Sequence, residues 1–151
     1  MIRRVSATLL LLLAAGAAAA APAKSVTLIG RNDLRFSKDH ITAAPGQKIT
    51  VKLVNKSHLP ASAMSHNWVL LKPGADAGAI DAAAQSAVDN DYIPASKSDR
   101  IIAHTGMVAG GESATVTFMA PEKPGDYEYI CTFPGHFTAG MKGVLTVAPE
   151  G

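Results

Sequence analysis

Apolar and polar residues alternate in short runs along most of the chain. This period of two is typical of strands that bury one face, whereas an amphipathic helix has a period of 3.6. Residues 44–47, 110–111 and 124–126, rich in glycine and proline, provide turns between runs. The pattern predicts an antiparallel β-sandwich or barrel, with strands in runs at residues 26–29, 49–54, 68–71, 101–103, 114–118, 127–130 and 144–147.

Residues 76–88 depart from this pattern. They are rich in alanine and contain neither a proline nor a run of β-branched residues. Alanine has the highest helix propensity of all residues. We therefore expect one helical insertion in a domain that is otherwise built from strands.

The N-terminus has the composition of a secretory signal peptide. Arg3 and Arg4 are followed by an uncharged run, and Ala-Pro-Ala at residues 21–23 fits the usual cleavage pattern. We expect residues 1–23 to be a signal peptide and residues 24–151 to form one periplasmic domain. An uncleaved anchor is the alternative, because an uncharged run of this length can just span a bilayer.

Removal of the predicted signal changes the charge balance. The whole chain has 14 basic and 12 acidic residues, and without Arg3 and Arg4 the two numbers are equal. A formally neutral domain has no charge-based attraction to nucleic acid or to an anionic membrane. We expect no nucleic-acid partner, and membrane attachment only if the N-terminal segment stays uncleaved.

The most reactive side chains are concentrated in residues 131–141. Cys131, the only cysteine of the chain, is followed by His136 and Met141. A lone cysteine in an exported protein cannot form an internal disulfide, so it forms an intermolecular link or is a ligating or reactive thiol. Thiolate, imidazole and thioether groups suit copper, whose trigonal sites combine one cysteine, two histidines and a distant methionine.

His66 is the candidate for the second histidine. It precedes the run at residues 68–71, and a Greek-key sandwich can bring that strand start close to the loop after Cys131. Other interpretations stay open, because Cys131 could be an inert buried thiol, a nucleophile or a zinc ligand, although methionine argues against zinc. Three histidines lack matching partners, and we expect them not to bind metal: His40, His58 and His104.

Four separated motifs resemble the azurin/auracyanin branch of the cupredoxins, the blue copper proteins. They occur in the order of that family, at residues 66–70, 102–105, 131–136 and 141–143, and the likeness extends over residues 24–149. The resemblance implies an all-β, Greek-key sandwich or barrel of about eight strands, with a helical insertion around residues 76–88. It also implies one type 1 copper ion per chain.

The resemblance assigns His66, Cys131 and His136 as equatorial ligands and Met141 as the axial one. It also implies that the backbone N–H groups of Asn67 and Phe133 point at the thiolate. Three features differ from azurin. Ser65 replaces a glycine whose carbonyl is a distant axial neighbour, the loop between His136 and Met141 is one residue longer, and a disulfide is missing.

The function implied by the resemblance is that of a small periplasmic electron carrier, not an enzyme. Redox partner proteins would dock on an apolar surface around the edge of His136. Two alternatives are a copper carrier or chaperone without an electron-transfer role, and a cysteine-dependent enzyme that needs no copper. The residues expected to form the docking surface are Leu34, Leu59, Met64, Phe133, Phe137 and Ala139.

Overall fold

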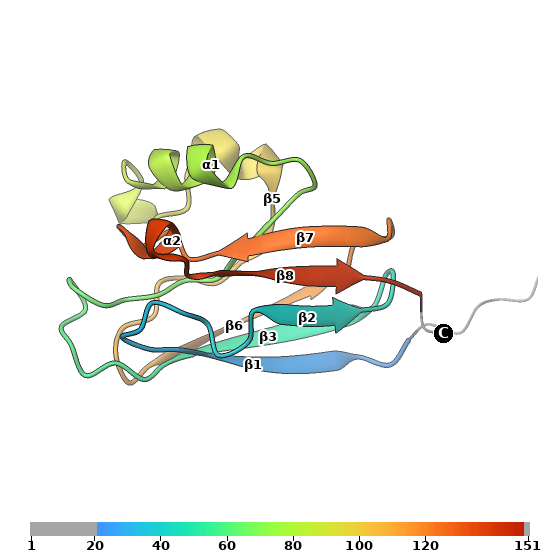
Figure 1. Cartoon of the computed structure of the whole chain (residues 1–151), viewed down its shortest axis with the longest axis horizontal. Helices are drawn as coiled ribbons and strands as arrows, with labels where there is room; N and C mark the ends of the chain where they lie inside the picture. The colour runs from blue at the N-terminus through green and yellow to red at the C-terminus, as the bar shows by residue number, and fades with distance from the viewer. Residues whose placement is uncertain (1–20, 150–151) are drawn as a thin grey trace, which may run out of the picture.

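In the computed structural model, residues 21–149 are described, and eight strands within them form two sheets that pack face to face (Figure 1). The three-stranded sheet has the order β1 (Lys24–Gly30), β3 (Lys48–Asn55) and β6 (Ser113–Met119). The five-stranded sheet has the order β2 (His40–Ala43), β8 (Lys142–Val147), β7 (Gly125–Ile130), β4 (Val69–Leu71) and β5 (Ile101–His104). The predicted all-β sandwich of about eight strands is confirmed.

The core follows from the alternation of the sequence. In β3, the side chains of Ile49, Val51 and Leu53 are fully buried, while the residues between them face outward or lie at intermediate depth. In β7, Tyr127 and Tyr129 have the same inward orientation. The period of two therefore places one face of each strand between the sheets, where burial of apolar surface stabilises the fold.

Two expectations about the sheets are corrected. Strand β2 was not predicted, because its four residues offer only Ile41 and Ala43 as buried apolar positions. The pairing is also not antiparallel throughout, since β1 runs parallel to β3 and β2 runs parallel to β8. The chain passes from β1 to β2 in the other sheet and returns to β3, so β1 and β3 lie side by side in the same direction.

The helical insertion is present but is more divided than expected. Helix α1 (Ala77–Ala84) starts after Asp76, whose carboxylate accepts the backbone N–H of Ala79 at 3.0 Å. This capping contact satisfies an N–H group that has no partner within the helix. Two 3₁₀ segments follow α1, namely η1 (Val88–Asn90) and η2 (Ala95–Arg100). A short helix that was not predicted, α2 (His136–Ala139), lies between β7 and β8.

Helix α1 covers the outer face of the five-stranded sheet (Figure 1). Ile80 packs with Val69, Leu71 and Ile130, which point away from the main core. Both faces of β4 are therefore buried, and this explains why its three residues are all apolar. The insertion thus stabilises the strand that follows His66.

Among residues 21–149, no helix is long and apolar enough to cross a membrane. The predicted signal peptide at residues 1–23 lies outside the described part of the chain, except for residues 21–23.

Candidate metal centre

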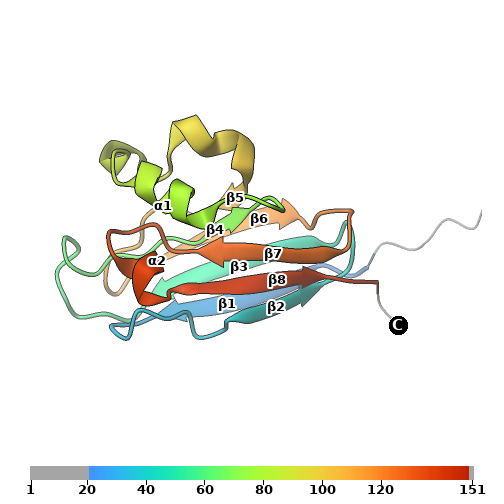
Figure 2. The ribbon, with the colours of Figure 1, turned by 45° about the horizontal axis from the view of Figure 1, so that its top comes forward.

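Strand geometry directs two of the predicted ligands into the space between the sheets. Cys131 continues the inward-facing series of β7, and His66 precedes Trp68 and Leu70, which face inward on β4. Strands β4 and β7 are antiparallel, with Leu70 opposite Tyr129. The residues just before β4 and the C-terminal end of β7 therefore meet at one end of the sandwich (Figure 2).

The loop between β7 and β8 returns the other two predicted ligands to the same end. Helix α2 is a single turn that ends at Gly140, whose φ of 102° is rarely adopted by residues with a side chain. The backbone N–H of Met141 donates to the carbonyl of His136 at 2.9 Å, and the Met141 carbonyl accepts the N–H of Cys131 at 3.0 Å. These bonds fold residues 131–141 into a closed loop.

Three predicted ligands, two from this loop and His66 from the segment before β4, converge at this end of the sandwich. The Nδ1 atoms of His66 and His136 are 3.2 Å apart, and Cys131 Sγ is 3.6 Å from Nδ1 of His136. The ligand atoms of this group all lie within 4.8 Å of one another. Met141 is fully buried in the core cluster that contains Cys131. A soft sulfur, two imidazoles and a nearby thioether fit copper better than zinc.

Burial sets the protonation states of these groups. Loss of hydration lowers the pKa of His66 to about 4, and the Arg31 carbonyl and Asp33 carboxylate oppose this only in part. Loss of hydration also lowers the pKa of His136 to about 4, with a smaller contribution from His66. Both imidazoles are therefore neutral at pH 7 and can donate lone pairs to a metal ion.

The thiol of Cys131 behaves in the opposite way. Loss of hydration raises its pKa to about 12, and the Asp81 carboxylate adds to the increase. Hydrogen bonds from the backbone N–H groups of Asn67 and Phe133 favour the thiolate and reduce the shift. These are the two donors that the resemblance implied. Because metal binding requires a thiolate, the sulfur must lose a proton when an ion binds.

Backbone and side-chain contacts fix His66 from two sides. Its N–H and carbonyl pair with Val108, at 3.0 and 2.8 Å. The Nδ2 group of buried Asn55 donates to the carbonyls of Met64 and Val108, both at 2.9 Å, and its Oδ1 accepts the N–H of Ser57 at 2.8 Å. Asn55 thus makes three side-chain hydrogen bonds, which hold the chain segments around His66 in place.

A second buried network surrounds Cys131. The Oδ1 of Asn67 accepts the N–H of Thr132 at 2.8 Å, and its Nδ2 donates to Thr132 Oγ1 at 2.8 Å. The carbonyls of Asp91 and Tyr92 accept from Asn67 and Thr132 respectively. Sequence reasoning found neither this network nor the role of Asn55, because no motif in residues 88–93 indicates that their carbonyls reach the site.

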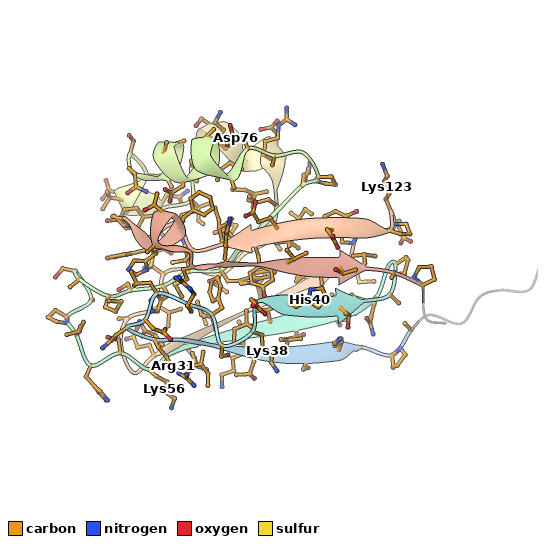
Figure 3. All side chains as sticks on the ribbon, viewed as in Figure 1. Arg31, Lys38, His40, Lys56, Asp76 and Lys123 are labelled. Atoms are coloured by element: carbon orange, nitrogen blue, oxygen red, sulfur yellow. The ribbon has the colours of Figure 1, made fainter. Side chains whose placement is uncertain are left out.

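The other histidines lie outside this group, as expected. His40, His58 and His104 are exposed, and none belongs to the cluster of possible ligands found among residues 21–149. Figure 3 shows His40 on β2, and Lys123 at the far end of the sandwich, in the turn between β6 and β7.

The predicted docking surface has a more varied exposure than expected. Leu59 is 44% exposed and Ala139 is also exposed, whereas Leu34, Met64 and Phe137 are half-buried. Phe133 is buried and packs on His136, with ring centroids 4.7 Å apart. Phe137 packs on the α1 cluster beneath Lys142, which leaves less of its surface free for a partner.

A two-sheet sandwich with a buried Cys-His-His cluster at one end defines a metal-binding β-sandwich protein. Residues 23–148 match the family described as copper binding proteins, plastocyanin/azurin family. The chain belongs to this family of blue copper proteins, which is known for electron transfer. Membership confirms copper as the cofactor and the predicted resemblance.

Individual relatives agree with this placement. Auracyanin-B of Chloroflexus aurantiacus is 41% identical over 130 residues, which are 85% of this chain and 54% of that protein. Azurin of Pseudomonas aeruginosa is 38% identical over 150 residues, covering 97% of this chain and 99% of that protein. The chain is thus similar to azurin over nearly its whole length, whereas it spans about half the length of Auracyanin-B.

Solved structures support the same fold. Auracyanin A of Chloroflexus aurantiacus, described as a "blue" copper protein, gives a TM-score of 0.75 at 38% identity. The alignment covers 85% of this chain and all of that structure. Dithionite-reduced auracyanin from Roseiflexus castenholzii gives a TM-score of 0.74 at 40% identity. That alignment covers 83% of this chain and 97% of that structure.

Proposed function

We propose that this protein is a periplasmic electron carrier in which His66, Cys131 and His136 bind one copper ion equatorially and Met141 binds it axially. The observation that carries the proposal is the burial of two imidazoles and one thiol whose ligand atoms lie within 4.8 Å of one another. A copper ion bound there supplies a Cu(II)/Cu(I) couple that exchanges one electron.

The residues around the site suit this role because they hold the ligands in place. Asn55 and Val108 fix the backbone of His66, and the closed loop from residue 131 to residue 141 fixes the other ligands. A rigid set of ligands rearranges little when the charge of the site changes. The site is also buried, so that water has little access to the ligand atoms.

The path to a partner runs through the ring of His136. His136 is 3% exposed and its ring packs against Phe133, and we expect the edge of this ring to be the part nearest a partner. Leu59, Ala139 and the exposed parts of Leu34 and Met64 supply apolar surface for a redox partner protein. A small apolar surface on a formally neutral domain suits brief and weak docking.

In this role the protein neither makes nor breaks a bond of a substrate, and it is not an enzyme. Export to the periplasm rests on the signal-like sequence of residues 1–23. The alternative of a copper carrier predicts that the ion is given up readily to another molecule.

Competition with a chelator separates these two functions. We expect the protein loaded with Cu(I) to retain its ion against a competing Cu(I) chelator during repeated cycles of oxidation and reduction. One electron should be exchanged per copper in each cycle. Rapid transfer of Cu(I) from the reduced protein to the chelator would favour the carrier.

A further inference from the structure

Two consecutive residues between the 3₁₀ segments η1 and η2 have a left-handed backbone. Asp91 has φ 52° and ψ 31°, and Tyr92 has φ 56°. Residues with a side chain rarely adopt this conformation, and when they do it is usually as single residues. Two in succession, one of them aromatic, are strained, and such strain persists only where surrounding contacts enforce it.

The contacts that enforce this turn come from residues next to the predicted ligands. Asn67 Nδ2 donates to the Asp91 carbonyl at 2.9 Å, and Thr132 Oγ1 donates to the Tyr92 carbonyl at 2.7 Å. Asn67 and Thr132 are fully buried and are joined to each other by two hydrogen bonds of 2.8 Å.

The two neighbouring carbonyls of this turn, those of Asp91 and Tyr92, therefore both accept hydrogen bonds from one buried polar pair. The side chain of Tyr92 adds a contact with Phe133, at 5.6 Å between ring centroids.

The polar pair lies directly beside the thiol. Asn67 follows His66, Thr132 follows Cys131, and the N–H groups of Asn67 and Phe133 hydrogen-bond to the sulfur. We propose that the strained turn at Asp91 and Tyr92 is a positioning element, which holds Asn67 and Thr132 so that both N–H donors stay on the sulfur of Cys131. This inference rests on the copper site proposed above.

The first test changes the backbone preference at residue 91 while it keeps the carbonyl. Asp91→Val disfavours the left-handed conformation, whereas Asp91→Gly and Asp91→Asn permit it and are matched controls. Hydrogen bonds to the thiolate stabilise the electron-rich reduced site. We therefore expect Asp91→Val to lower the reduction potential by about 59 mV, which corresponds to a tenfold lower Cu(I)/Cu(II) ratio at a given applied potential. The thiolate-to-copper absorption band should also shift.

The second test removes the hydroxyl that binds the turn. Thr132→Val has a similar shape but lacks both the donor to the Tyr92 carbonyl and the acceptor for Asn67 Nδ2, and Thr132→Ser restores a hydroxyl that can supply both. We expect the potential and the absorption band to change in Thr132→Val and to return toward the original values in Thr132→Ser. This pair of variants carries the test if Asp91→Val does not fold.

Hydrogen exchange in protein without added copper gives an independent measurement. We expect Asp91→Val to speed exchange of the Asn67 and Phe133 amides at least tenfold relative to the Leu145 amide in β8. A uniform increase at all three amides, together with unchanged potential and absorption in both tests, would overturn the positioning role. An original protein that binds Cu(II) without a blue band would instead contradict the proposed site.

Discussion

Gly30, the last residue of β1, supports the ring of His66 by close approach. A Cβ atom at residue 30 would collide with Cδ2 of the imidazole and would lie 3.0 Å from its Cγ. The ring therefore rests on the backbone of β1, while Asn55, at the end of the neighbouring strand β3, holds the chain around residue 66. The ends of two paired strands thus position His66, one of the proposed ligands.

Substitution of Gly30 by alanine should displace the His66 ring. We expect Gly30→Ala to lower the free energy of unfolding by about 1–3 kcal/mol, because overpacking forces side chains or backbone to shift. The affinity for Cu(II) should also fall. Chemical denaturation and a copper titration measure both effects.

Gly78→Ala is the matched control for this substitution. Its nearest neighbour would be 3.4 Å away, and alanine favours the helix in which it lies. The control should keep its copper affinity. Equal affinity in Gly30→Ala and Gly78→Ala would contradict the supporting role of Gly30.

Substitution of Asn55 should weaken the same ligand from its backbone side. Asn55→Leu removes the hydrogen-bond partner of the Met64 carbonyl and of the Ser57 N–H. Each buried polar group left without a partner costs about 1–3 kcal/mol. We expect a loss of about 2–4 kcal/mol in urea denaturation, together with a changed copper spectrum. The same change at exposed Asn32 should have little effect, and a similarly small effect at Asn55 would refute this interpretation.

Copper-free protein should lose stability on acidification. The pKa values of His66 and His136 are lowered to about 4, whereas in the unfolded chain they are near 6.5. The unfolded chain therefore binds more protons between these pH values, and stability falls as pH decreases through this range. We expect a loss on the order of 6 kcal/mol between pH 7 and pH 4, with about 3 kcal/mol from each histidine.

Urea denaturation at several pH values measures this dependence. Replacement of both histidines by leucine should flatten the curve, because leucine has no proton to gain. An equally steep curve in the doubly substituted protein would assign the acid sensitivity to other groups.

Replacement of Met141, the proposed axial ligand, should change the reduction potential more than the affinity for copper. Met141→Leu keeps an apolar side chain of similar size in the core and removes a weak donor to Cu(II). We expect copper to remain bound and the reduction potential measured by voltammetry to rise. A large loss of Cu(II) binding would mean that the thioether is a principal ligand.

The alternation of the sequence predicts the strands that bury many apolar residues, and its motifs predict the candidate metal ligands. The alternation around Tyr127 and Tyr129 suffices to place Cys131 between the sheets. Strand β2 escapes prediction because its stability comes from its pairing with β8, and not from its own four residues. Its parallel direction likewise depends on a crossover between sheets that no local pattern encodes.

The supporting residues of the site are less predictable than the ligands. Asn55 has no motif, and its role depends on Met64 and Val108, which only the folded chain brings together. The left-handed turn at Asp91 and Tyr92 contains no glycine to indicate it. In both places, tertiary contacts determine a conformation that local sequence preferences do not specify.

The absorption spectrum of the copper-loaded protein tests the central claim most directly. Bound to Cu(II), the protein should be intensely blue, lose this colour when one electron per copper is added, and regain it on oxidation. Cys131→Ser should bind no copper that gives this band, because the band requires the thiolate of Cys131. A pale Cu(II) complex of the original protein, or a blue band that persists in Cys131→Ser, would contradict the proposed site.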